Sequence, residues 1–178
     1  MSAASTSLDL RQIPVLLRGQ PESIDAWAQR WEGKRVLLYV AVIIVGTGVY
    51  GAAMGCWRAP LQACYTALKL PLIILLTTLG NALLNGMLAP LLGLNLTFRQ
   101  SSLAILMSFT IAATILAAFS PIMFFLVWNT PPMTAQAEHN ATAFSFIQLT
   151  LVASIAFAGI VANLRLVQLL RKRSRPRG

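Results

Sequence analysis

Residues Val36 to Trp57 read VLLYVAVIIVGTGVYGAAMGCW, a run of 22 residues without a charged side chain. As an α-helix this run is about 33 Å long, close to the hydrocarbon thickness of a bilayer. Three more long apolar runs follow it, at 70–94, 102–128 and 144–170. None of them alternates with a period of two, as barrel strands do, so the sequence predicts four transmembrane helices.

The composition favours the same class of protein. Of the 178 residues, 57% are hydrophobic and only 11% are charged, whereas about a quarter of a soluble domain is charged. A soluble globule, a disordered chain and a disulfide scaffold are therefore disfavoured. We expect an all-α, polytopic integral membrane protein, with four transmembrane helices over 36–170 and short interfacial helices outside them.

The net charge of +9 is concentrated at the two ends of the chain. Eleven of the fourteen Lys and Arg residues lie toward the two ends of the chain: five precede the first apolar run, Arg165 lies near the end of the last run, and five follow it. Those that flank the helices most directly are Lys34, Arg35, Arg171, Lys172 and Arg173. Lys and Arg are enriched on cytoplasmic segments, where they fix topology and meet lipid headgroups. We therefore expect a multi-pass membrane protein with both termini in the cytoplasm and no nucleic-acid partner.

Three segments outside the spans also carry predictions. The cytoplasmic segment 1–35 contains an amphipathic stretch, 21–31, which favours a helix in the headgroup layer over one packed on the bundle. Residues 171–178 form a basic cytoplasmic tail. Residues 58–69 have apolar side chains at three- and four-residue spacing and predict a short helix on the outer membrane surface. The alternative makes that last stretch an extension of the second span.

The sequence shows no arrangement of residues that is typical of an enzyme. No Asp or Glu lies in any of the four runs, and the single histidine, His139, has only Glu138 beside it. General acid–base catalysis and metal binding both need more such groups than this. We expect no catalytic, cofactor-binding or metal-binding residues, and we expect Cys56 and Cys64 to be unpaired.

Polar residues inside the apolar runs form a candidate site. Thr77, Asn81 and Asn85 recur every four residues and so share one helix face, and Asn163 lies in the fourth run. Asparagine in hydrocarbon needs a polar partner, so this face either joins helices or lines a polar pathway. A water-filled cavity at Asn81 and Asn85 would favour transport, whereas a dry, packed bundle would favour a role in assembly.

Small residues mark two candidate packing faces. Gly51 and Gly55 have the Gly-xxx-Gly spacing, and Ser154, Ala158 and Ala162 repeat it in the fourth run. Such faces let helix backbones approach closely. They serve packing within one chain and dimerisation equally well, and the sequence leaves both open.

Several short stretches within residues 36–170 form a recognisable pattern, and they are Ala67-Leu68-Lys69-Leu70-Pro71-Leu72, Leu75-Leu76-Thr77, Gly93, Phe98-Arg99-Gln100 and Ser120-Pro121-Ile122-Met123-Phe124-Phe125. In these stretches the chain resembles an uncharacterised family of small bacterial, often cyanobacterial, membrane proteins, which implies a location in the bacterial inner (plasma) membrane. The same pattern is distantly similar to Yip1-type domains. It departs from the family at Leu83 and Ala89, where we would expect a proline and an asparagine. The resemblance implies a multi-helix membrane fold without known catalytic activity.

Together these features predict a non-enzymatic membrane protein that acts as an organiser or accessory subunit through helix packing. Its expected partners are membrane lipids and other membrane subunits or further copies of itself, without a cofactor. The alternative is a small homo-oligomeric transporter or channel that uses the polar face of the second helix.

Overall fold

The computed structural model describes residues 33–91, 98–130 and 141–173. This part of the chain forms four helices, which are α3 (Gly33–Gly55), α4 (Pro60–Leu91), α5 (Phe98–Asn129) and α6 (Ala141–Arg173). The predicted helix at 21–31 lies outside the described residues, as does the tail beyond Arg173. The four helices expected from the apolar runs are confirmed, and each is long and apolar enough to cross a membrane.

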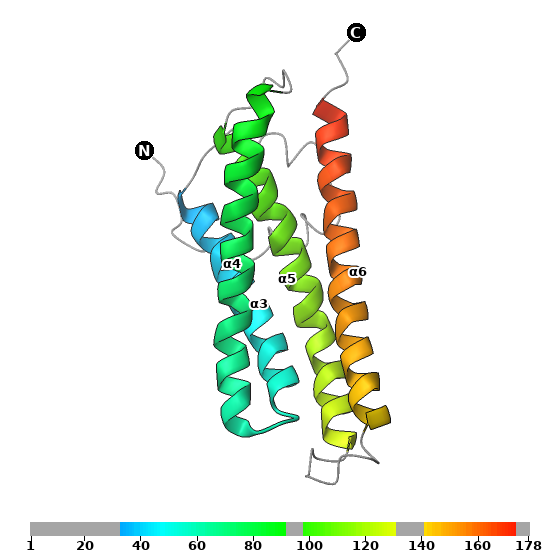
Figure 1. Cartoon of the computed structure of the whole chain (residues 1–178). Coiled ribbons are helices and arrows are strands. Elements are labelled where there is room, and N and C mark those ends of the chain that lie inside the picture. The colour runs from blue at the N-terminus through cyan, green and yellow to red at the C-terminus, as the bar shows by residue number, and fades with distance from the viewer. Residues whose placement is uncertain (1–32, 92–97, 131–140, 174–178) are drawn as a thin grey trace, which may run out of the picture.

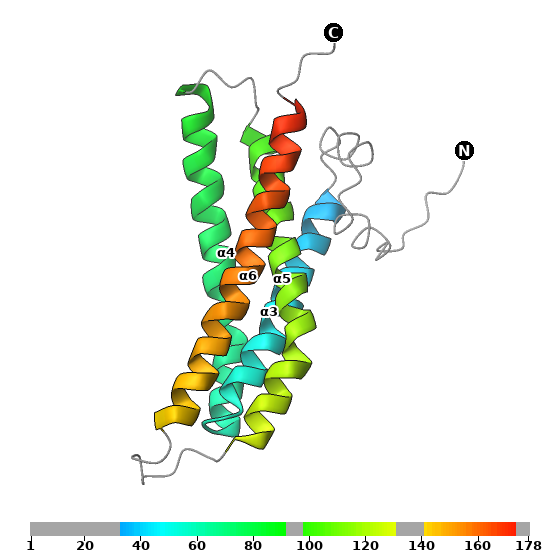
Figure 2. The same ribbon diagram turned by 90° about the vertical axis from the view of Figure 1, so that its right-hand side faces the viewer.

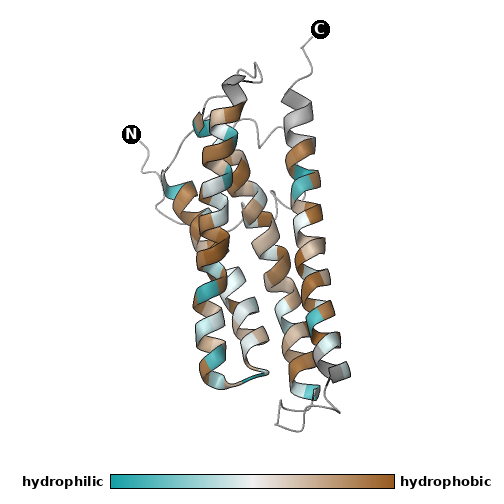
Figure 3. Cartoon of the chain, viewed as in Figure 1, coloured by the Kyte–Doolittle hydropathy of each residue, from teal (hydrophilic) through white to brown (hydrophobic). Residues whose placement is uncertain are grey.

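The helices run alternately up and down, as Figures 1 and 2 show. α3 packs against both α4 and α5, α4 also contacts α5, and α6 packs mainly on α5. The start of α3, the start of α5 and the ends of α4 and α6 therefore share one end of the bundle. Hydrophobic residues cover all four helices, and the more polar ones gather near the helix ends and at places along α4 (Figure 3).

α3 presents glycines to both of its main neighbours. A Cβ atom placed on Gly51 would lie 2.6 Å from the backbone carbonyl oxygen of Thr66 on α4, and Gly55 approaches α4 just as closely. On another face, a Cβ on Gly46 would lie 2.7 Å from the carbonyl oxygen of Ala113 on α5. Side chains are not tolerated at such distances. The absence of a side chain at these positions therefore lets α3 lie against both helices at once.

The prediction of a separate surface helix at 58–69 is wrong. Pro60 begins α4, which continues without interruption to Leu91. The cause is packing on α3: Ala63, in the first turn of α4, is buried and its Cα would lie 2.6 Å from a Cβ on Gly55. Part of the apolar spacing of this stretch thus reflects contact with another helix.

Pro71 lies inside α4, whereas the apolar run at 70–94 would place it in the first turn of a helix. A proline cannot donate a hydrogen bond to the carbonyl four residues back, here that of Ala67. This part of α4 faces Gly48 of α3, where a Cβ would be in ordinary van der Waals contact, 3.4 Å from the Ala67 oxygen and 3.7 Å from the Pro71 ring. Pro71 is therefore buried at the contact between α3 and α4.

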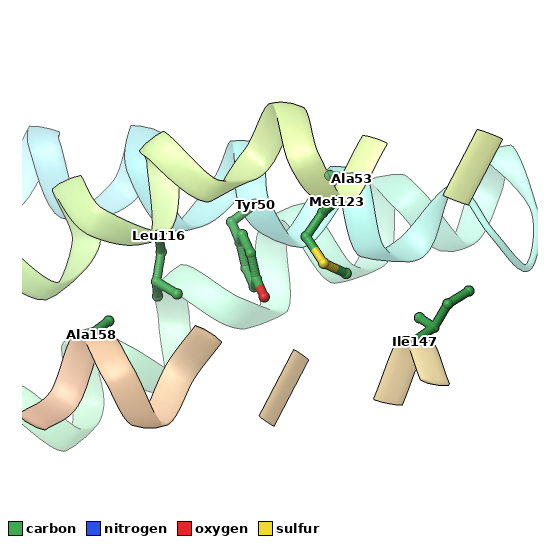
Figure 4. Packing of buried hydrophobic residues seen from close by; sticks show 6 residues of the cluster. All are labelled: Tyr50, Ala53, Leu116, Met123, Ile147 and Ala158. Carbon is green, nitrogen blue, oxygen red and sulfur yellow. The ribbon is translucent and has the colours of Figure 1, made fainter. Parts of the chain in front are cut away.

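The main core fills the end of the bundle that holds the α3–α4 turn. Its buried members come from α3, α5 and α6, and are Tyr50, Ala53, Leu116, Met123, Ile147 and Ala158. Figure 4 shows the Tyr50 ring reaching from α3 toward α6, between Leu116 and Met123 of α5. Tyr50 thus bridges two helices that otherwise share little contact.

Candidate functional site

A cavity of about 340 Å³ lies between α4 and α6 on the surface of α5. It exists because α4 and α6 barely touch each other within the described residues. Polar and apolar side chains line it together, and they include Asn81, Asn85, Ser108, Phe109, Ala162 and Asn163. The structure therefore brings Asn163 of α6 together with Asn81 and Asn85 of α4, which are distant from it in the sequence.

The polar groups of this cavity lack hydrogen-bond partners in the described part of the chain. Ser108 of α5 is only 7% exposed, yet neither its hydroxyl nor the side-chain amides of Asn81 and Asn163 form a hydrogen bond with another described residue. Asn85 is partly satisfied, because its Nδ2 donates a 2.9 Å hydrogen bond to the Asn81 backbone carbonyl. Side-chain hydrogen-bond donors and acceptors from three helices thus face one cavity without forming hydrogen bonds to one another.

Most other hydroxyls in the helices behave differently. They donate to the carbonyl four residues back in their own helix, as in Thr47, Thr77, Thr78, Thr110, Thr114, Ser120 and Ser154. Thr77 is exposed and does not line the cavity. The polar face expected at Thr77, Asn81 and Asn85 is therefore divided, and only the two asparagines belong to the site.

The cavity ends at the packed core. Ala112 lines the cavity and also packs against the cluster around Tyr50. Tyr50 is fully buried, and its hydroxyl forms no hydrogen bond of good geometry with the described residues, although Ser154 of α6 lies nearby. In this conformation the cavity is a pocket in one half of the bundle and not a continuous path through it.

The small residues expected at packing faces lie at helix contacts. Gly51 and Gly55 meet α4, as described above. Ser154, Ala158 and Ala162 of α6 are all buried, and Ala162 forms part of the cavity wall. Both sets serve packing within one chain here.

Positive charge gathers at the end of the bundle where α3 begins and α6 ends. Lys34 and Arg35 lie in the first turn of α3, and α6 ends at Arg173 after Arg171 and Lys172 (Figure 1). All five Asp and Glu residues of the chain lie outside the described ranges. Within those ranges no group of His, Cys, Asp and Glu could hold a metal ion, and Cys56 and Cys64 are both free and exposed.

Several cavity residues could not be predicted from the sequence. Phe109, Gly159 and Leu166 line the cavity, but an aromatic, a glycine or a leucine in an apolar run is ordinary. They line a cavity only because α4 and α6 are separated in the folded bundle. The presence of Ser108 near the asparagines is predictable in part, because a serine in a neighbouring helix is a possible hydrogen-bond partner for them. That its hydroxyl forms no hydrogen bond with the described residues is not predictable.

Comparison with protein-family models, curated proteins and solved structures found no match to this chain. The resemblance to small bacterial membrane proteins and to Yip1-type domains therefore stays a prediction. The fold and the cavity define the class: an all-helical chain with four potential membrane spans and an amide-lined pocket between two of them.

Proposed function

We propose that the chain is a multi-pass protein of the bacterial inner membrane with both termini in the cytoplasm. Four apolar helices in alternating directions support this. Basic residues gather at the end shared by the start of α3 and the end of α6, and positive residues favour the cytoplasmic side. The bacterial origin rests on the resemblance described above.

Within that membrane the protein acts as an organiser or accessory subunit, and the cavity between α4 and α6 is its contact site. One observation carries this: Ser108, Asn81 and Asn163 face the cavity without hydrogen-bond partners among the described residues. Unsatisfied polar groups are costly in hydrocarbon. A polar side chain from a partner's transmembrane helix would satisfy them, as serine and asparagine do between membrane helices.

The chemistry of the cavity supports binding and not catalysis. Carboxamides and a lone hydroxyl do not ionise near neutral pH and so cannot serve as general acids or bases, and among the described residues no carboxylate or imidazole stands beside Ser108 to activate it. The same neutral lining discourages coupling to an ion gradient, which ordinarily uses ionisable groups within the membrane.

A transporter is the second candidate, and the cavity itself favours it. A polar-lined space at Asn81 and Asn85 is the feature that we expected of a transport pathway. The packed core around Tyr50 ends that space within the bundle, so transport would need a second conformation. A partner helix needs only access from the side, which the separation of α4 from α6 provides.

Photo-crosslinking in living cells tests the two candidates. Phe109 lines the cavity and is replaced by p-benzoyl-phenylalanine. The matched control is the same replacement at Phe125, which lies on the same helix and is 68% exposed. An accessory subunit should give a discrete protein adduct from position 109 and none from 125, and an adduct of twice the chain's mass would identify the partner as a second copy.

Thiol labelling tests the alternative, which is that the cavity is open to water and not closed by a partner helix. Gly159→Cys, in a chain with Cys56→Ala and Cys64→Ala, places a thiol at the cavity. If the cavity is closed by a partner helix, a membrane-impermeant maleimide should not reach this thiol from either side. Rapid labelling from the cytoplasmic side, together with no adduct at position 109, would contradict the accessory role and favour transport.

A further inference from the structure

A second groove lies between α3, α4 and α5, away from the asparagines. Its volume is about 230 Å³, and its lining includes Val36 and Val40 of α3, Leu79 and Ala82 of α4, and Leu106 of α5. Thr78 and Ser102 also line it, but their hydroxyls donate to the backbone carbonyls of Ile74 and Phe98, at 2.7 and 2.9 Å. The groove therefore presents an almost entirely apolar surface.

Cationic residues stand at one end of this groove. Lys34 and Arg35 directly precede Val36 on α3, and Arg99 is one helical turn before Ser102 on α5. Lys34 and Arg99 are exposed. The starts of α3 and α5 share this end of the bundle, so the three cations lie at the same end of the groove. The chain has no carboxylate within its described residues to neutralise their charge.

An apolar groove with cations at its mouth matches one kind of molecule, an anionic phospholipid. We propose that the groove holds an acyl chain of such a lipid and that Lys34 and Arg99 bind its phosphate. The groove opens at the side of the bundle, where acyl chains lie, and its cations lie at the end that we place at the cytoplasmic surface, where basic sites between helices bind anionic headgroups. A soluble anion would use the cations but not the groove.

Lipid binding to the purified full-length protein tests this. Native mass spectrometry would compare phosphatidylglycerol with phosphatidylcholine of identical acyl chains. We expect phosphatidylglycerol to bind at least tenfold more tightly. Lys34→Gln with Arg99→Gln should weaken its binding about 30-fold, or about fivefold for each cation. The matched control, Arg58→Gln with Lys69→Gln, removes the same charge elsewhere and should leave the affinity within about twofold.

A second pair of variants tests the groove itself. Ala82→Phe fills the groove, whereas Gly80→Phe places the same side chain on the same helix at a position where a Cβ meets no neighbouring residue within 4 Å. Only the first should displace phosphatidylglycerol. Leu79→Trp, at a groove residue that is already 58% exposed, serves the same purpose if Ala82→Phe does not fold.

Three results would overturn the proposal. Equal affinity for the two lipids would exclude recognition of the anionic headgroup. Equal losses from the two charge variants would indicate a general effect of net charge. Unchanged phosphatidylglycerol binding with the groove filled would mean that the lipid rests on surface cations alone, or that another segment of the chain occupies the groove.

Discussion

Ser108, Asn81 and Asn163 stand apart from the other polar residues of the bundle. A threonine or serine in a helix can donate to the carbonyl four residues back, and most of those described do so. A carboxamide has two donors and an acceptor, which one carbonyl cannot satisfy. The asparagines therefore need something outside their own helix, and the described chain does not supply it.

This predicts a specific result for Asn81→Leu. Because the Asn81 side chain forms no hydrogen bond within the described residues, the isolated protein should lose less than about 0.5 kcal/mol of unfolding free energy. The crosslink from position 109 should nevertheless disappear. Thermal unfolding in detergent measures the first effect, and a loss above about 1 kcal/mol would mean that the amide joins helices within one chain.

The glycines of α3 and α4 offer a matched pair. Gly51→Ala would place a methyl group 2.6 Å from the Thr66 carbonyl oxygen and should destabilise the bundle by about 1–3 kcal/mol through overpacking. Gly80→Ala meets nothing within 4 Å and should stabilise α4 by about 0.5–1 kcal/mol. Unfolding of both variants under one set of conditions checks the difference, and equal effects would contradict the close approach of α3 to α4.

The buried hydroxyl of Tyr50 supports a third prediction about a single residue. Its hydroxyl is buried without a hydrogen bond of good geometry, so Tyr50→Phe should be neutral or stabilising by about 1 kcal/mol. Ser154→Ala removes the neighbouring hydroxyl and should be equally mild. If Tyr50→Phe instead lowers the thermal stability as much as the loss of a buried hydrogen bond would, the two hydroxyls are bonded across α3 and α6.

At the scale of elements, the sequence predicts the four helices well and their boundaries less well. The apolar runs are long and uninterrupted, and a helix is the only compact way to satisfy their backbone in a bilayer. This reasoning does not place residues 60–69, because the same apolar spacing fits a helix that faces lipid and a helix that packs on another helix. Only the glycine face of α3 decides between them, and its contact with Ala63 and Thr66 is a property of the folded bundle.

The candidate site divides along similar lines. Asn81 and Asn85 are predictable as a pair, since four-residue spacing in one helix fixes their common face. That Asn163 joins them depends on how α6 packs on α5, and no pattern within one helix encodes that. Thr77 shares their spacing but lies outside the cavity, because the cavity occupies only one half of the bundle.

The continuity of α4 predicts how deep its first turns lie. Spin labels at Leu61, Cys64 and Leu68 should show a steady increase in depth, by up to about 10 Å from the first to the last, at about 1.5 Å per residue along the helix. Power saturation with oxygen and a water-soluble relaxant measures this in proteoliposomes. Equal, shallow depths would restore the separate surface helix and contradict the structure.

At the scale of the whole molecule, the two ends of the bundle differ in the residues that they carry. Trp57 and Trp128 lie at the end opposite the basic cluster, and Trp128 is 89% exposed. Tryptophan favours the membrane–water interface, which supports the assignment of this end to the outer surface. Arg58 follows Trp57 directly and lies at the same end.

Topology is directly testable with single cysteines in the chain that lacks Cys56 and Cys64. In intact cells an impermeant maleimide should label Thr130→Cys, at the outer end, and miss Gly33→Cys. Permeabilised cells, in which both thiols should react, provide the control. The reverse pattern would invert the assignment of the basic end to the cytoplasm.

The glycine-faced α3 also bears on the order of assembly during synthesis. It is the first described helix to leave the ribosome, and it has the largest share of buried residues among the four spans. In the proposed membrane topology, α4 and α5 would each dock onto it as they emerge, and α6 would then dock onto α5, so every new helix would find its main partner already inserted. α3 alone would enter the bilayer with its binding faces empty, and for as long as translation takes to produce α4, those faces would be open to any other helix in the membrane.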